Sequence, residues 1–143
     1  PLSRIAAARP PSGSYTYSGH PVGAAAALAA IAETRRLDVV TNAAARGTQL
    51  YDGMVSLAGQ YPVVGDVRGG HGLMTAMELV ADRETKAPID GKLAIKMQKA
   101  SYQAGALIRV SGPNVILSPS LVIEEADIDI ALNAVEEGLK AIS

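Results

Sequence analysis

The chain has 143 residues, a formal net charge of −1 and no cysteine. This length is typical of one ordinary domain, and 48% hydrophobic residues allow a real core, whereas 19% charged residues argue against disorder. The near-neutral charge excludes a broad basic surface for nucleic acid. The lack of cysteine excludes disulfides, thiolate zinc sites and cysteine nucleophiles, and it fits a reducing compartment. We therefore expect a cytoplasmic protein.

No targeting or membrane segment is visible. The longest apolar run, residues 21–32, falls short of the roughly 20 residues that a membrane-spanning helix needs. The N-terminus lacks the charged-then-apolar order of a signal peptide. Because the first residue is Pro1 and not Met, we expect a fragment, a processed product or a trimmed chain.

The first half of the chain predicts an irregular start and two helices. Residues 1–14, with three prolines, predict either an irregular arm or linker or a disordered segment. The alanine-rich residues 21–34 predict a helix, and small side chains all round it predict burial on several sides. Asp38 is placed to cap a second helix that ends near Gly59. Spacings of three and four define the apolar face of that helix, made of Val40, Ala44, Gly47, Leu50, Met54 and Leu57.

The second half predicts strands and helices in alternation. Residues 63–68 and 73–80 are expected to form a hairpin around a turn at 69–72, and a polar loop follows at 82–91. The next expected element is a helix with Leu93, Met97, Ala100 and Ala104 on one face. Strands are expected at 106–110 and 115–117. The last expected element is a helix whose apolar face is formed by Ile128, Leu132, Val135, Leu139 and Ile142. This order predicts a sandwich-like α+β fold: a small, largely antiparallel sheet with helices on one face.

Most motifs that suggest chemistry have a simpler structural explanation. The glycines at 69–72 lie between two predicted strands, so a hairpin turn is favoured over a phosphate-binding loop, which needs a helix after it. His20 and His71 are far apart in the sequence, and the spacing of possible ligands does not indicate a metal site. The Gly-x-Ser-x-Gly motif of a serine nucleophile is not present. His20, just before Pro21, is expected to make a structural hydrogen bond.

Two features leave both a structural and a functional interpretation open. Arg109 sits in an otherwise apolar strand next to a turn, where a guanidinium could hold a carboxylate or simply be exposed at a sheet edge. Residues 15–18 place four hydroxyls ahead of a helix start. They could hold an anion such as phosphate or only cap the helix.

The segments together resemble the C-terminal part of class III aminotransferases, which use pyridoxal 5′-phosphate (PLP), and in particular omega-aminotransferases. The most specific match is Thr16-Tyr17-Ser18-Gly19-His20-Pro21, followed by the small-residue helix. The second is Val67-Arg68-Gly69-Gly70-His71-Gly72-Leu73-Met74 with Met77-Glu78-Leu79-Val80. The third is Gly105-Ala106-Leu107-Ile108-Arg109 with Val115-Ile116-Leu117-Ser118-Pro119. They come in the family's order and cover about residues 13–142.

The resemblance implies a domain division and three site residues. Residues 1–36 would be an arm and helix from the edge of the large cofactor domain of a fold type I enzyme, and residues 37–143 its C-terminal small domain. Tyr15 and Thr16 would bind the cofactor phosphate of the other subunit of a homodimer, and Arg109 would bind a substrate carboxylate.

The resemblance also implies that the chain has no catalytic residue of its own. In the family, the lysine that forms the Schiff base and the aspartate at the pyridine nitrogen precede the segment matched here, so both would lie before Pro1. The lysines of this chain stand in contexts unlike that lysine's: Lys86, Lys92, Lys96, Lys99 and Lys140. The chain alone is therefore expected to be inactive and not to bind PLP by itself.

The expected activity of the parent protein is transfer of an amino group from an amine or amino acid to a keto acid. Two alternatives stay open: a PLP-dependent aminomutase or decarboxylase of the same family, and a non-catalytic α+β module for dimerisation or binding. No metal, nucleic acid or membrane partner is expected.

Overall fold

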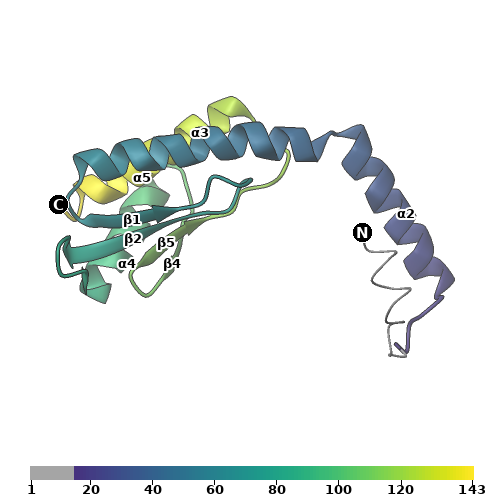
Figure 1. Cartoon of the computed structure of the whole chain (residues 1–143), viewed down its shortest axis with the longest axis horizontal. Coiled ribbons are helices and arrows are strands. Elements are labelled where there is room, and N and C mark those ends of the chain that lie inside the picture. Colours follow the sequence, from purple (N-terminus) through teal and green to yellow (C-terminus); the bar gives the residue numbers. More distant parts are fainter. Residues whose placement is uncertain (1–14) are drawn as a thin grey trace. The chain divides into compact units, whose positions relative to one another are not determined.

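The computed structural model describes residues 15–143, so the irregular arm predicted at 1–14 lies outside the described residues. The chain divides into two compact units, with the boundary between Arg36 and Leu37 (Figure 1). The expected division into 1–36 and 37–143 has its boundary at the same place. The origin of the first unit in a large cofactor domain stays a prediction.

The first unit contains helix α2, Pro21–Arg36. Proline suits the first turn of a helix because its missing N–H would have no partner there, and alanine favours the helical turns that follow. The predicted structural hydrogen bond of His20 is confirmed, since its Nδ1 accepts from the backbone N–H of Gly23 at 3.3 Å. No residue of α2 is buried, so the expected burial on several sides is wrong for this chain. Within residues 15–36, α2 is the one regular element, and no other element of that unit covers it.

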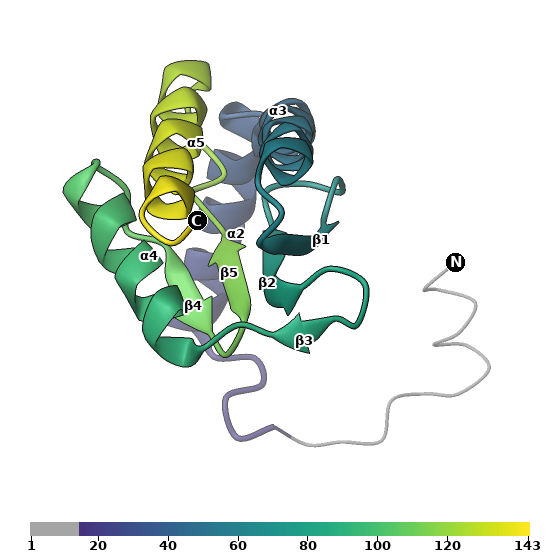
Figure 2. The same ribbon diagram turned by 90° about the vertical axis from the view of Figure 1, so that its left-hand side faces the viewer.

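The second unit has three helices and a small sheet (Figure 2). The helices are α3 (Val39–Gln60), α4 (Gly91–Gln103) and α5 (Glu125–Lys140). The strands are β1 (Val64–Arg68), β2 (Thr75–Asp82), β3 (Ala87–Pro88), β4 (Arg109–Ser111) and β5 (Asn114–Leu117). The order across the sheet is β1-β2-β5-β4, with β3 paired to β2, and every pairing is antiparallel. The predicted α+β fold is confirmed.

Alternating strand residues separate the helix-covered face of the sheet from its open face. Met77 of β2 pairs with Val67 on one side and Val115 on the other, and both Met77 and Val115 are fully buried under the helices. The helices contribute large side chains to the same core, among them Leu50, Met54, Met97, Ile128 and Leu139. The core therefore lies between one face of the sheet and the three helices.

The buried face of α3 begins one residue earlier than its sequence pattern indicates. Val39 and Ala43 are buried, whereas Val40 is 73% exposed, and the predicted face applies only from Gly47 onward. Asp38 is the N-cap residue, but its side chain makes no capping bond. Its Oδ1 accepts instead from the hydroxyl of Thr41 at 2.9 Å.

The turn between β1 and β2 is a glycine turn packed against α3. Gly69, Gly70 and Gly72 have φ angles of 152°, 85° and 80°, which side chains with a Cβ rarely adopt. A Cβ at Gly47 of α3 would clash with the carbonyl oxygen of Gly72. The predicted hairpin turn is confirmed, and a glycine on the helix permits its close approach.

The loop after β2 covers irregular backbone of β1. The pairing of β1 with β2 shifts register between Val64 and Asp66. Arg83 donates from Nε and Nη2 to the carbonyl oxygen of Val64, at 2.9 and 2.8 Å, and Lys86 Nζ donates to the carbonyl oxygen of Gly65 at 2.8 Å. The predicted polar loop is thus tied to the outer strand of the sheet, and it also contains the short strand β3.

Candidate functional site

Arg109 is the first residue of β4, the edge strand of the sheet opposite β1, and it pairs with Ile116 of β5. Its side chain is exposed. Among residues 15–143, no carboxylate forms an ion pair with its guanidinium. A guanidinium with no acid to neutralise it keeps its full attraction for an added carboxylate.

The backbone before Arg109 is fixed by α4. Gln98 Nε2 donates to the carbonyl oxygen of Ile108 at 2.8 Å, and the side chain of Ile108 is buried in the core. The strand predicted at 106–110 therefore begins only at Arg109, because the carbonyl before it is bonded to a helix side chain and not to a neighbouring strand. The chain enters this segment through Gly105, whose φ is 108°.

A cavity of about 230 Å³ adjoins Arg109. Strands β4 and β5 and their flanking residues form one side, and helices α3 and α5 contribute the rest. Its lining is mostly aliphatic, and Arg109 is the one charged residue in it. The site thus combines one unneutralised cation with an apolar hollow.

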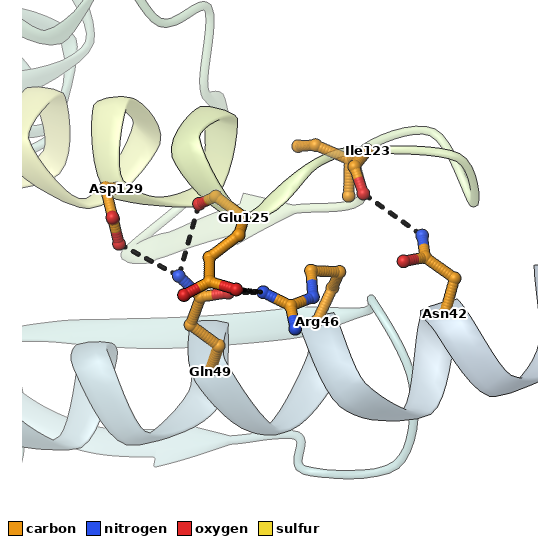
Figure 3. Close-up of polar contacts among 6 residues, drawn as sticks. All are labelled: Asn42, Arg46, Gln49, Ile123, Glu125 and Asp129. Atoms are coloured by element: carbon orange, nitrogen blue, oxygen red, sulfur yellow. Dashed lines mark hydrogen bonds and ion pairs between the residues drawn. The ribbon is translucent and has the colours of Figure 1, made fainter.

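Polar contacts between α3 and α5 hold the helix that closes this cavity (Figure 3). Arg46 Nη1 lies 2.8 Å from Glu125 Oε2. Gln49 Nε2 donates to Asp129 Oδ1 at 2.9 Å and to the carbonyl oxygen of Glu125 at 3.2 Å. These contacts join the first turns of α5 to the middle of α3.

Asn42 holds the segment that leads from the cavity to α5. Its Nδ2 donates to the carbonyl oxygen of Leu121 at 2.8 Å and to that of Ile123 at 3.0 Å, and Figure 3 shows the second of these bonds. One amide group thus satisfies two carbonyls of an irregular segment, which fixes the path of the chain after β5.

The two residues expected to bind a cofactor phosphate share one turn in the first unit. Ser18 N–H donates to the carbonyl oxygen of Tyr15 at 2.9 Å, and His20 N–H donates to that of Tyr17 at 3.1 Å. Tyr15 and Thr16 are exposed. Within residues 15–143, no backbone N–H of Thr16 or Tyr17 donates to another backbone carbonyl. This turn therefore presents a hydroxyl and N–H groups without a backbone acceptor among residues 15–143, and such groups are the donors a phosphate needs.

The structure thus brings Tyr15 and Thr16 together, whereas Arg109 belongs to the second unit. Sequence reasoning missed Gln98 and Asn42, because each contacts a carbonyl in another element and no local spacing marks such a contact.

In residues 15–143, no group of three or more metal-ligating side chains could hold an ion. None of the helices in the same residues is long and apolar enough to cross a bilayer.

All five lysines of the described chain are exposed. Lys140 lies 2.9 Å from Glu137 and 3.1 Å from Glu136, and the hydrogen bonds to these carboxylates raise its pKa. Lys86 is bonded to a backbone carbonyl. A lysine that attacks a carbonyl needs a neutral amine, which burial or a neighbouring cation favours, and the two carboxylates beside Lys140 have the opposite effect.

Comparisons with known proteins agree with one another. A family model described as "Aminotransferase class-III" matches residues 3–139. The taurine–pyruvate aminotransferase of Bilophila wadsworthia is 36% identical over 134 residues, which are 89% of this chain and 29% of that protein. The leucine/methionine racemase of Thermococcus litoralis is 34% identical over 132 residues, which are 91% of this chain and 29% of that protein.

A solved structure extends the similarity to the fold. The PLP-bound amine transaminase from an uncultivated Pseudomonas species superposes with a TM-score of 0.83 at 36% identity, over 92% of this chain and 30% of that one. The chain thus spans less than a third of the proteins that it resembles. The family match, the sequence identity and the shared fold together show that the chain belongs to the class III aminotransferases.

Proposed function

We propose that this chain supplies the substrate-orienting part of a PLP-dependent enzyme that moves an amino group from an amine or amino acid to a keto acid. The observation that carries the proposal is Arg109, an exposed guanidinium without a carboxylate partner in the described chain, beside an apolar cavity. Amino acids and keto acids carry the carboxylate that this group would bind in a bidentate manner. An amine substrate without a carboxylate would offer the guanidinium no partner, so the guanidinium would stay in water.

Tyr15 and Thr16 are the proposed contacts to the cofactor phosphate. Their turn fits such a group, because the Thr16 hydroxyl is exposed and the N–H groups of Thr16 and Tyr17 donate to no described backbone carbonyl. When bound, PLP supplies an electron sink for the carbon that loses its proton. The residues of this chain would hold the phosphate and orient the substrate. In a homodimer the phosphate would be that of the other subunit, and we place the enzyme in the cytoplasm.

We further propose that the chain alone does not catalyse. The reaction needs an amine to bond the cofactor and to carry a proton, and the five exposed lysines of this chain offer no buried or activated amine. The same family includes a relative named as a racemase, so a different reaction at the same kind of site is the second candidate.

The first test is the absorption spectrum of the purified chain with added PLP, before and after borohydride, with mapping of any labelled lysine. The expected result is no saturable adduct and only scattered labelling of exposed lysines. A stoichiometric adduct at one lysine, bleached by an amine donor, would show that the reaction centre is present in this chain.

The role of Arg109 needs a complete enzyme. A chimera in which residues 3–139 replace the matched part of the Bilophila taurine–pyruvate aminotransferase would provide one. Arg109→Gln is expected to raise KM for alanine at least tenfold and to change KM for 1-phenylethylamine little. Arg35→Gln, an exposed arginine of α2, is the matched control. An equal loss for both donors would refute carboxylate binding by Arg109.

A further inference from the structure

We propose that the outer face of α4 docks an acidic segment of another protein, a segment with several carboxylates and a large apolar side chain. This lysine face consists of Lys92, Ile95, Lys96, Lys99 and Tyr102, all of them exposed. Nothing in the inference depends on the proposed carboxylate site at Arg109.

Helical spacing separates the lysine face from the core. The buried residues of α4 are Ala94, Met97 and Ser101, which recur three and four residues apart and so lie on one side of the helix. The exposed lysine face recurs at the same spacing on the opposite side. Helix α4 packs against α5 and β4 (Figure 2). The lysine face is therefore turned away from the core of the second unit.

The charges of this face have no counter-charge in the described chain. Among residues 15–143, no carboxylate forms an ion pair with Lys92, Lys96 or Lys99. Helix α4 contains no acidic residue. Lys96 stands four residues after Lys92 and three before Lys99, and like charges at these spacings repel one another. Carboxylates of a docked segment would relieve this repulsion.

Apolar side chains accompany the charges. Ile95 is 64% exposed and Tyr102 is 65% exposed. Together with Gln98, Lys99 and Leu107 they line a shallow hollow of about 310 Å³. A cavity of about 150 Å³ already holds benzene, so this hollow has room for one large apolar side chain. An apolar anchor surrounded by polar and charged groups is typical of protein interfaces.

This combination favours a protein segment over an anionic membrane or a nucleic acid. Membrane-binding helices carry clusters of about four to eight basic residues, more than the lysine face provides, and a flat bilayer has no use for a hollow. The chain as a whole has a net charge of −1, which opposes nucleic-acid binding. Lys92 and Lys99 are about 10 Å apart along the helix axis, a span that a two-turn helical segment of a partner matches.

The test uses the 143-residue chain and a display library of short random peptides. Peptides are selected on the native chain and counter-selected on the double variant Lys96→Glu/Lys99→Glu. We expect the enriched peptides to combine an excess of Asp and Glu with at least one large apolar residue. Synthetic copies should bind the double variant at least tenfold more weakly, and added salt should weaken their binding to the native chain. Backbone amide shifts in NMR titrations should centre on Ile95, Lys99 and Tyr102.

Further variants separate the apolar contribution from the charges. Ile95→Ser and Tyr102→Ser should each weaken the best peptide at least threefold, and thermal unfolding should stay near that of the native chain because both side chains are exposed. Ile31→Ser and Arg35→Glu are the matched controls. On α2 this exposed isoleucine and arginine stand four residues apart, as Ile95 and Lys99 do on α4. Both controls should leave the Kd unchanged.

Three results of the selection would overturn the inference. They are the absence of enrichment over the double variant, enriched peptides without an acidic excess, and NMR shifts centred away from α4. Vesicles of phosphatidylcholine and phosphatidylserine, and a single-stranded RNA, are tested in parallel. Tighter binding of either one than of the best peptide would overturn the inference in favour of a membrane or a nucleic acid.

A last measurement asks whether the lysine face stays accessible in a longer enzyme. The best peptide is titrated into the chimera in which residues 3–139 replace the matched part of the Bilophila aminotransferase. The expected Kd equals that of the 143-residue chain. Loss of binding in the chimera would show that another part of the enzyme covers the lysine face, and docking of a separate protein would be refuted.

Discussion

Gln98 of α4 donates a hydrogen bond of 2.8 Å to the carbonyl oxygen of Ile108, the residue immediately before Arg109. A helix side chain therefore takes the place of a strand neighbour at the point where β4 begins. Since Ile108 is itself buried, both its carbonyl and its side chain are held. The Arg109 backbone at the sheet edge is thus held by this amide before it and by its own pairing with Ile116 of β5.

Gln98→Leu should lower the free energy of unfolding by roughly 1–2 kcal/mol, because the Ile108 carbonyl loses its partner. Amide hydrogen exchange in β4 should accelerate more than exchange in β1 or β2. The same substitution at Gln103, exposed on the same helix, is the matched control. Equal exchange rates in β4 of the native chain and Gln98→Leu would contradict the role given to this bond.

Asn42→Ala should lower the free energy of unfolding by about 1–2 kcal/mol, since one amide group satisfies the carbonyls of both Leu121 and Ile123. Chemical denaturation measures this change. Asn133→Ala on α5, where the side chain is exposed, should change it little. Similar losses for the two variants would show that the bonds from Asn42 contribute nothing particular.

Two glycines of α3 should respond in opposite ways to alanine. Gly47→Ala should destabilise the chain by about 1–3 kcal/mol, because its Cβ would clash with the carbonyl oxygen of Gly72. At Gly59 an added Cβ would meet open space. Gly59→Ala should therefore stabilise the chain by up to about 1 kcal/mol, because alanine reduces the backbone entropy of the unfolded state. Thermal unfolding of the two variants checks the signs, and a stabilising Gly47→Ala would disprove the close approach.

The Asp82 side chain should stabilise the fold only above acidic pH. Its Oδ1 accepts from the N–H and the hydroxyl of Thr85, both at 2.7 Å, and from the N–H of Glu84 at 3.1 Å. The backbone bond from Thr85, followed by its hydroxyl, lowers the pKa of Asp82. A carboxyl whose pKa is lower in the folded state stabilises that state fully above its ordinary pKa of about 4, and this stabilisation is lost as the pH falls through the folded pKa.

Asp82→Asn should therefore have a lower free energy of unfolding than the native chain at neutral pH. This difference in free energy should shrink below about pH 4. Urea denaturation at a series of pH values measures both free energies of unfolding. Asp52→Asn, at an exposed position of α3, is the matched control. A difference between Asp82→Asn and the native chain that does not vary with pH would argue against stabilisation by the ionised carboxylate.

Sequence periodicity predicted the regular elements well because their apolar residues recur at helix or strand spacing. The hairpin around the glycine turn and the buried positions of α3 from Gly47 onward follow directly from that pattern. The first turn of α3 does not, since Val40 suits the pattern as well as Val39 does, and only the packing decides between them. Burial of α2 was predicted wrongly, because composition reports that a helix could be buried and not whether a neighbour covers it.

The candidate site was predictable only in its charged residue. An arginine in an apolar strand is visible in the sequence, whereas the cavity next to Arg109 forms from residues of α5 and of the strands that meet only in the fold. The contacts of Gln98 and Asn42 likewise go to backbone carbonyls, which leave no mark in the sequence. The roles of Tyr15 and Thr16 came from family resemblance and stay predictions.

The side chains of Arg83 and Lys86 have a consequence for the edge of the sheet at β1, because both donate to backbone carbonyls of that strand. By donating to the carbonyl oxygens of Val64 and Gly65, they occupy backbone acceptors of the edge strand β1, which are then not available to a strand from a second molecule. A foreign strand would have to displace two cations before it could extend the sheet, and exposed sheet edges are a common route to aggregation. We therefore expect the β1 edge at Val64 and Gly65 to resist edge-to-edge extension of the sheet by successive molecules.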